Sequence, residues 1–597
     1  MLWEICLGIS IWVVILPMTI MLCIEAQSSR TGVHAPIFRV GIVCMLIAVS
    51  VNLFPFLLGD EPQNALTIAK AVLFSILHGL KAFGLGVENE MLQNAIGFCP
   101  ESLRVGYQIC TVVLLLLAPL FTVGFVLSLF RNLSARMQYA LAYHREMYVF
   151  SELTDKSLTL AQDIAHNHPD AVIAFAGTLG REETVSAELL RGANRFGAIL
   201  FHSDITAIAT LKHSRKKGLW LFAMGEDDNK NLDLALELIS LRAEYPNTHL
   251  YVSALTAESD LLLSSVEKGK VRVRRINEAR SMTYHMLEAS GGRLFDNAIP
   301  AQDGIKEIHA VIVGLGHHGT EMLKALTWYC QMDGYRVHIH AFDRDPLAEE
   351  KLTAAAPELL SPKYNGVFVK GEAQYTITVH SGYDTATARF ADAVSRIQSA
   401  SYVLISLGDD DLNTQTAVQL RMLFARAGIH PVIQAILYDS RRKAAMTNIT
   451  NFRKQPYDIE FVGDLQSSYA EDNIIRSALE EQALQRHLKW GKAEEFWNYE
   501  YNYRSSMAAA LHMQARIHCG IPGADLPEEE MQGEAKTRFE MLEHRRWNAY
   551  MRSEGYVYSG SPDASSRNDL AKMHHNLVDY DTLPEADKRK DSRVGLK

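Results

Sequence analysis

The chain has 597 residues, enough for several domains, and carries a formal net charge of −10 with a pI of about 6.1. This acidic balance argues against a nucleic-acid-binding platform. The seven cysteines form no Cys-x-x-Cys pair and no Cys/His cluster, so the sequence indicates neither a metal site nor a disulfide framework.

The N-terminal part, 1–132, is dominated by apolar runs and predicts an α-helical transmembrane domain. Three of the runs are long enough to cross a bilayer, namely 5–24, 37–58 and 107–130. Arg131 and Arg136 follow the third run, and the positive-inside rule then places the large C-terminal part in the cytoplasm. We therefore expect a multi-pass protein of the cell inner membrane, with the lipid bilayer as a partner.

A fourth apolar segment, 65–87, also carries polar groups. Because an α-helix turns about 100° per residue, Lys70, His78 and Lys81 fall on one side of a helix here. One interpretation is that this side lines a water-filled pore or an oligomer interface. The other is a helix that lies on the membrane surface with its lysines reaching water. The number of predicted spans is therefore three or four.

Two later segments, 145–300 and 305–475, repeat a pattern of alternating strands and helices. This pattern predicts an α/β fold with two doubly wound Rossmann-like domains in tandem. Both segments carry a similar polar motif after the fourth strand, Gly-Glu-Asp-Asp-Asn-Lys-Asn at 225–231 and Gly-Asp-Asp-Asp-Leu-Asn at 408–413. The repetition indicates an internal duplication at the level of domains.

The second segment contains a dinucleotide-binding fingerprint. An apolar strand runs into Gly314-x-Gly316-x-x-Gly319, a helix follows, and the next strand ends in Asp343, 24 residues after Gly319. Such glycines let backbone N–H groups approach a pyrophosphate at a helix N-terminus. Asp343 is expected to accept hydrogen bonds from a ribose. The expected ligand is NAD or another adenine nucleotide.

The corresponding positions of the first segment hold other side chains. Ser151, Leu153 and Lys156 align with the three glycines, and Ala176 aligns with the acid. These side chains fill the space that a pyrophosphate needs, so we predict a scaffold that has lost dinucleotide binding. Binding of some other ligand is the alternative.

The tandem over about 145–475 resembles the TrkA-N, or RCK, domains found on the cytoplasmic side of potassium channels and transporters. The resemblance depends on the fold pattern and on the motif at 408–413. It implies domains that dimerise into gating assemblies whose geometry shifts on ligand binding, and hence a homo-oligomer. A Thr-Val-Gly-Tyr-Gly type filter is missing from the first 130 residues, which argues against a selective potassium channel but not against a non-selective pore.

A helical linker is expected over 476–530, and its aromatic run suits packing between helices. The final segment, 531–597, carries signature residues in a fixed order: His544-x-x-Trp547, Gly555-Tyr556, and His574-x-x-Leu577-Val578-x-Tyr580-x-x-Leu583-Pro584-x-x-x-Lys588. This series resembles the RyR repeat, the module named after ryanodine receptors. Tyr556 stands where the family has Trp, His575 stands where it has Pro, and Asn548 intervenes before Ala549.

The RyR resemblance implies a small, mainly α-helical module that binds an adenine-type nucleotide, such as a cyclic nucleotide or an ADP-ribose derivative, between aromatic rings. The expected ligand-binding residues are His544, Trp547, Arg552, Tyr556, Tyr558, His574 and Tyr580. Stacking on such rings contributes roughly 1–3 kcal/mol per base. Trp547 also suits a position in the core of the module.

The sequence shows no catalytic constellation, so we do not expect an enzyme. The leading interpretation is a nucleotide-sensing membrane effector or ligand-gated channel, gated from the RyR module and the second Rossmann-like domain. Bacterial proteins that combine these parts resemble effectors of anti-phage defence. The alternatives are a membrane-anchored NAD-dependent oxidoreductase and an RCK-type regulator of potassium transport.

Overall fold

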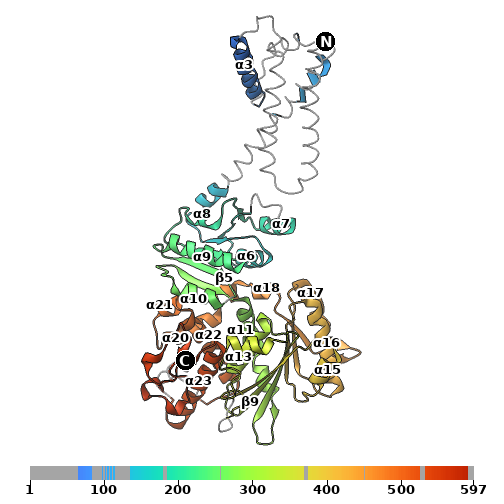
Figure 1. Ribbon diagram of the computed structural model, residues 1–597, viewed down its shortest axis with the longest axis vertical. Coiled ribbons are helices and arrows are strands. Elements are labelled where there is room, and N and C mark those ends of the chain that lie inside the picture. Colours follow the sequence, from blue (N-terminus) through green and yellow to red (C-terminus); the bar gives the residue numbers. More distant parts are fainter. Residues whose placement is uncertain are drawn as a thin grey trace. The chain divides into compact units, whose positions relative to one another are not determined.

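The computed structural model describes residues 65–83, 97, 101, 104–106, 108–109, 112–113, 118, 135–178, 185–255, 257–368, 374–449, 451–522, 524 and 531–588. The chain divides into two compact units, Met1–Thr154 with Asp170–Leu219, and Asp155–Pro169 with Trp220–Lys597. Figure 1 shows the helices and strands of these units along the chain.

The first sheet has the strand order β3-β2-β1-β4-β5-β6. Its strands are β1 (Met147–Phe150), β2 (Val172–Phe175), β3 (Ile199–Leu200), β4 (Leu219–Ala223), β5 (Thr248–Ser253) and β6 (Arg272–Ile276). The pairs β1–β2, β2–β3 and β5–β6 are parallel. The helices between these strands are α6 (Asp155–Asn167), α7 (Ala187–Arg195), α8 (Ile205–Ala209), α9 (Asp228–Arg242) and α10 (Ala257–Ser265). This order is that of a Rossmann-like fold.

The second sheet repeats the plan, with the order β10-β9-β8-β11-β12-β15. Its strands are β8 (Lys306–Val313), β9 (Tyr335–Asp343), β10 (Tyr375–Ser381), β11 (Tyr402–Ile405), β12 (Val432–Ile436) and β15 (Ile459–Val462). These strands pair in parallel, while the short β7 (Ile299–Pro300) pairs antiparallel with β8. The predicted tandem of α/β sheets is therefore confirmed.

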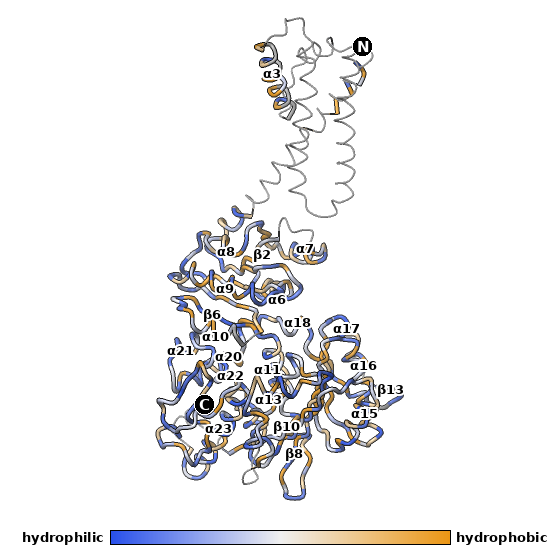
Figure 2. The backbone as a smooth tube through the Cα atoms, in the orientation of Figure 1, coloured by the Kyte–Doolittle hydropathy of each residue, from blue (hydrophilic) through white to orange (hydrophobic). Residues whose placement is uncertain are grey.

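Successive side chains of β8 point to opposite faces of the second sheet, and each face packs against its own set of helices. Ile308, Ala310 and Ile312 belong to one core, together with α13 (His317–Tyr329) and α11 (Glu278–Ser290). Val311 and Val313 belong to the other core, with α15 (Ala388–Ser395) and α16 (Asp410–Arg426). Figure 2 shows hydrophobic residues recurring along α13 and the strands of this sheet.

The C-terminal helices share a core with the second sheet. They are α20 (Ala478–His487), α21 (Ala493–Asn498), α22 (Glu500–His518) and α23 (Gly533–Ser553). Ala508, Ala510 and Ala515 of α22 are at most 1% exposed, and such small side chains let helices approach closely. Trp328 of α13 and Tyr550 of α23 meet edge to face, with ring centroids 6.1 Å apart. Motion of α13 would therefore be transmitted to the C-terminal helices through this shared core.

The predicted membrane domain, and with it the inner-membrane location, is wrong on the evidence of the described residues, where no helix is long and apolar enough to cross a bilayer. The runs 5–24 and 37–58 lie outside those residues, as does most of 107–130. The fourth candidate forms α3 (Ala65–Phe83). It carries Lys70, which is exposed, and Lys81, and a lysine is costly in hydrocarbon. The side chain of His78 lies outside the described residues, so the predicted pore lining has no support.

Candidate nucleotide-binding site

The glycine turn follows β8 at the carboxyl edge of the second sheet. Gly314 has φ +94°, a conformation that other residues adopt at a cost. A Cβ atom on Gly319 would collide with the carbonyl oxygen of Gly314 and with Oγ of Ser406, so only glycine lets α13 approach the turn so closely. The hydroxyl of Ser406 also donates to that carbonyl, at 3.0 Å. Two of the three predicted glycines are therefore required by the turn itself.

Gly316 has a different role, because it lies at the N-terminus of α13 and faces open space. It is exposed, and a Cβ atom placed on it would meet no atom within 4 Å. Gly316 is also the N-cap residue, and no side chain caps the helix there. The first N–H groups of an α-helix lack acceptors within the helix and attract anions. This end of α13 is therefore shaped to receive a phosphate group.

Asp343 ends β9, the strand next to β8, as the sequence predicts. Its carboxylate accepts hydrogen bonds from the backbone N–H of Leu315 at 2.6 Å and of Asp345 at 2.7 Å. The side chain therefore also holds the glycine turn in place. Each carboxylate oxygen has a second lone pair, so Asp343 keeps acceptor capacity for a ribose hydroxyl.

The structure adds to this edge Tyr438, which the sequence analysis did not single out. Tyr438 follows β12, and its hydroxyl lies 3.1 Å from Nδ1 of His318 in the first turn of α13. Burial, with Glu278 and Asp410 nearby, raises the pKa of Tyr438 to about 12. Burial lowers the pKa of His318. Both groups are therefore neutral at pH 7 and can only exchange hydrogen bonds with a ligand.

The first sheet differs at the aligned positions. Leu153 is 6% exposed and Ala176 is 1% exposed, so apolar side chains stand where a turn glycine and the acid would be. Ser151 is buried as well. In the second unit, Lys156 of α6 forms an ion pair with Glu278. These features agree with a scaffold that does not bind a dinucleotide, although the loss of binding itself stays a prediction.

The polar motif shared by both segments is a structural clamp. The side chain of Asn413 accepts from the N–H of Leu407 at 2.7 Å and donates to the carbonyl of Ile436 at 2.9 Å. Asn231 makes the corresponding two bonds in the first sheet, at 2.6 Å and 3.0 Å. Each asparagine thus links the end of one strand to the end of the next. This identical function supports the internal duplication.

Four of the seven residues predicted for the RyR ligand site come together. Nε2 of His544 lies 2.8 Å from the carbonyl oxygen of Val578. The ring of Trp547 lies 5.7 Å from that of His544 and 4.9 Å from that of His574, and the ring of Tyr580 lies 6.1 Å from His544. Trp547 is half-buried. This aromatic cluster, formed by His544, Trp547, His574 and Tyr580, is the part of the predicted site that the structure assembles.

The other three predicted residues make contacts outside the aromatic cluster. The guanidinium of Arg552 lies 3.5 Å from the ring centroid of Tyr364, and the N–H of Tyr558 donates to Glu358 at 3.1 Å. Tyr556 is 8% exposed and packs on an α22 side chain. Arg552 and Tyr558 thus contact the second Rossmann-like domain, although Tyr558 also lies beside His574 of the aromatic cluster in the pairing of β16 (Val557–Tyr558) with β17 (Met573–His574).

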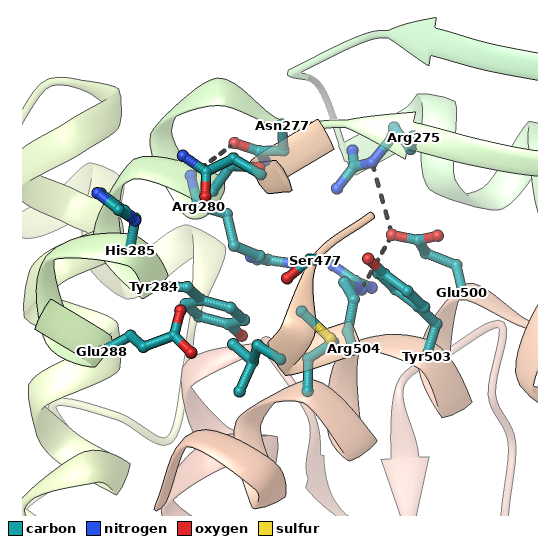
Figure 3. A pocket seen from close by; sticks show the side chains of 14 residues that line it. Arg275, Asn277, Arg280, Tyr284, His285, Glu288, Ser477, Glu500, Tyr503 and Arg504 are labelled. Atoms are coloured by element: carbon teal, nitrogen blue, oxygen red, sulfur yellow. Dashed lines mark hydrogen bonds and ion pairs between the residues drawn. The ribbon is translucent and has the colours of Figure 1, made fainter. Parts of the chain in front are cut away.

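A separate pocket is lined by residues of α11 and α22 (Figure 3). Its arginines already have carboxylate partners. Arg280 donates to Glu321 and to Glu554, both at 2.9 Å, and Arg504 donates to Glu554 at 2.8 Å. Glu500 lies between Arg275 and Arg504 in Figure 3. Because its charges are balanced, this pocket is a weaker candidate for a phosphate than the N-terminus of α13.

No family model and no curated protein matches the chain. Among solved structures, the crystal structure of a mutant of GsuK is similar. The match covers 74% of this chain and 96% of that chain, with 14% sequence identity and a TM-score of 0.34. The Rossmann-like assignment therefore depends on strand order and pairing, and the TrkA-N and RyR resemblances stay predictions.

Proposed function

We propose that this chain is a nucleotide-sensing regulator whose second Rossmann-like domain binds an adenine nucleotide with a pyrophosphate, such as ADP or NAD. The observation that carries the proposal is the uncapped N-terminus of α13 at the open glycine Gly316, with Asp343 at the end of the adjacent strand. The first feature suits the phosphates and the second suits the ribose.

Binding without turnover is the second part of this proposal. The hydroxyl of Tyr438 lies at the same edge, but its pKa of about 12 leaves it protonated rather than poised as a base. We therefore expect NAD to remain unchanged when it is incubated with the protein and an alcohol or hydroxy acid.

Regulation would pass through α13, whose N-terminus faces the proposed ligand. Glu321 of the same helix binds Arg280, which also binds Glu554 directly after α23. A ligand that favours one position of α13 would thereby favour one arrangement of the C-terminal helices. Coupling of this kind typically amounts to about 1–3 kcal/mol. An adenine-type ligand at the aromatic cluster would act on the same helices from α23.

Isothermal titration of the full-length protein tests the binding step. We expect ADP and NAD to bind with one site per chain, more tightly than AMP, and adenosine or inorganic phosphate to bind weakly, because only the first two offer a pyrophosphate with a ribose. Gly316→Asp should weaken this binding strongly, while Trp547→Ala should leave it unchanged and affect only a ligand of the aromatic cluster. Equal binding of ADP by wild type and Gly316→Asp would refute the assigned site.

RCK-type control of potassium transport is the finer form of this proposal, and it derives from the resemblance of 145–475. We expect rubidium uptake by cells that express the wild-type chain to differ from uptake by cells that express Gly316→Asp at equal abundance. Identical uptake, with nucleotide binding intact in the wild type, would remove potassium transport from the proposal and leave nucleotide sensing in place.

A further inference from the structure

Three metal-binding side chains share one face of the second sheet near the start of its strands. Glu307 and His309 are two residues apart on β8, and side chains two apart on a strand point to the same face. In the register of β8 and β9, His309 lies directly opposite His338. The pairing of the two strands therefore brings a carboxylate and two imidazoles together.

The distances within this triad suit a single ion. Nε2 of His309 lies 3.3 Å from one carboxylate oxygen of Glu307, and Nε2 of His338 lies 3.7 Å from the other. The two imidazole rings are stacked, with centroids 4.7 Å apart. Ligand atoms of all three residues lie within 4.8 Å of one another. A metal ion about 2.0–2.2 Å from each ligand would fit between such atoms after small side chain rotations.

The triad also has unused coordinating capacity. Nε2 of His338 is shielded from solvent and has no hydrogen-bond partner among the described residues. The nearby cation Arg336 binds Asp303 at 2.8 Å and lies farther from Glu307, at 3.8 Å.

We propose that Glu307, His309 and His338 form a binding site for a divalent transition metal ion of the Zn²⁺ class. Two imidazole nitrogens and one carboxylate oxygen are a donor set that zinc uses in proteins, with a fourth position left for water or another ligand. His309 of β8 lies five residues before Gly314, which directly follows this strand, and five residues span about 16 Å at the rise of a β-strand. The metal site is therefore distinct from the glycine turn.

The bound ion is expected to cross-link β8 and β9. β8 leads into the glycine turn and β9 ends in Asp343, so an ion bound to both strands would fix the two elements that flank the proposed nucleotide. Metal binding to the folded state also raises the free energy of unfolding by mass action.

The test uses full-length protein that has been treated with EDTA and desalted, then titrated with Zn²⁺ in competition with a chromophoric chelator. We expect one ion per chain for the wild type. His309→Gln and His338→Gln should each weaken binding by at least about tenfold. His380→Gln is the matched control, because His380 lies on a neighbouring strand of the same sheet but outside the triad. Co²⁺ in place of Zn²⁺ should give the visible absorption of a four-coordinate site in the wild type and in His380→Gln, and not in the triad variants.

Thermal unfolding separates loss of metal binding from loss of folding. Without metal, the triad variants should unfold at the wild-type temperature, and Zn²⁺ should raise that temperature for wild type and His380→Gln alone. If a triad variant does not fold, Glu307→Gln, which keeps the shape of the side chain, takes its place. Wild-type protein that binds Zn²⁺ no more tightly than Glu307→Gln would overturn the proposal.

Discussion

Replacement of Gly316 by Asp provides the sharpest test of the nucleotide site, because the change is directed at the ligand and not at the fold. Gly316 has φ −66° and ψ −165°, which any residue can adopt, and its Cβ position is open. Asp is a good N-cap residue, and a non-glycine residue restricts the unfolded chain. We therefore expect the free energy of unfolding to stay unchanged or to rise by up to about 1 kcal/mol.

The expected loss of affinity follows from Coulomb's law. A carboxylate at Gly316 would lie beside the phosphate group that the end of α13 is proposed to hold. Two like charges about 5 Å apart at an effective dielectric constant of about 20 repel by about 3 kcal/mol. This corresponds to a roughly 200-fold weaker affinity for ADP.

Gly316→Asn is the matched control, since it has the same size and the same capping ability without the charge. Titration calorimetry of ADP into both variants and the wild type, at low and high salt, measures the charge effect directly. The difference between Asp and Asn should shrink as salt rises, because mobile ions screen the repulsion. Equal affinities of the Asp and Asn variants, with both folded, would show that no phosphate lies at this helix end.

Three further predictions concern stability. Glu543→Gln should lower the free energy of unfolding by about 3–5 kcal/mol in urea titrations, because Glu543 is 3% exposed and neutralises two buried arginines. Burial raises the pKa of Glu543, but the two arginines outweigh burial and hold this pKa below the ordinary value of 4.5. The free energy of unfolding of the wild type should therefore fall as the pH drops below 4.5. Glu543→Gln should lack this part of the acid sensitivity. Asn413→Ala should lower the free energy of unfolding by about 2–4 kcal/mol, since it leaves a backbone N–H and a carbonyl buried without their partners.

Exposed residues of the same types are the controls for these stability measurements. Glu534→Gln and Asn229→Ala alter exposed side chains and should change the free energy of unfolding by no more than about 0.5 kcal/mol. A Glu543→Gln protein as stable as Glu534→Gln would mean that the two arginines find other partners. An Asn413→Ala protein as stable as Asn229→Ala would mean that water replaces the clamp.

The elements that depend on local spacing could be predicted from the sequence. The turn from Gly314 to Gly319 and the acid Asp343 lie within one strand–helix–strand unit, so their spacing in the chain nearly determines their positions in space. The role of Asp343 in holding the N–H of Leu315 could not be predicted in the same way. Such a bond depends on the conformation of the turn, which the pattern of residues does not specify.

Features that depend on contacts between segments far apart in the chain could not be predicted from the sequence. Arg552 and Tyr558 fit the motif of a ligand site, yet their partners are Tyr364 and Glu358, on a loop of the second Rossmann-like domain. The metal triad escaped notice for a related reason, since His309 and His338 become neighbours only through the register of two strands.

The two sheets retain the same clamp but not the same turn, and this contrast separates folding from binding. Asn231 and Asn413 satisfy buried backbone groups, so either sheet would lose stability without its asparagine. The open position at Gly316 contributes nothing to packing, because a Cβ atom there would touch no other atom. A glycine that the fold does not require, at a helix end that no side chain caps, is best explained by a ligand that occupies the space. In the first sheet the aligned residue is Leu153, whose side chain is buried.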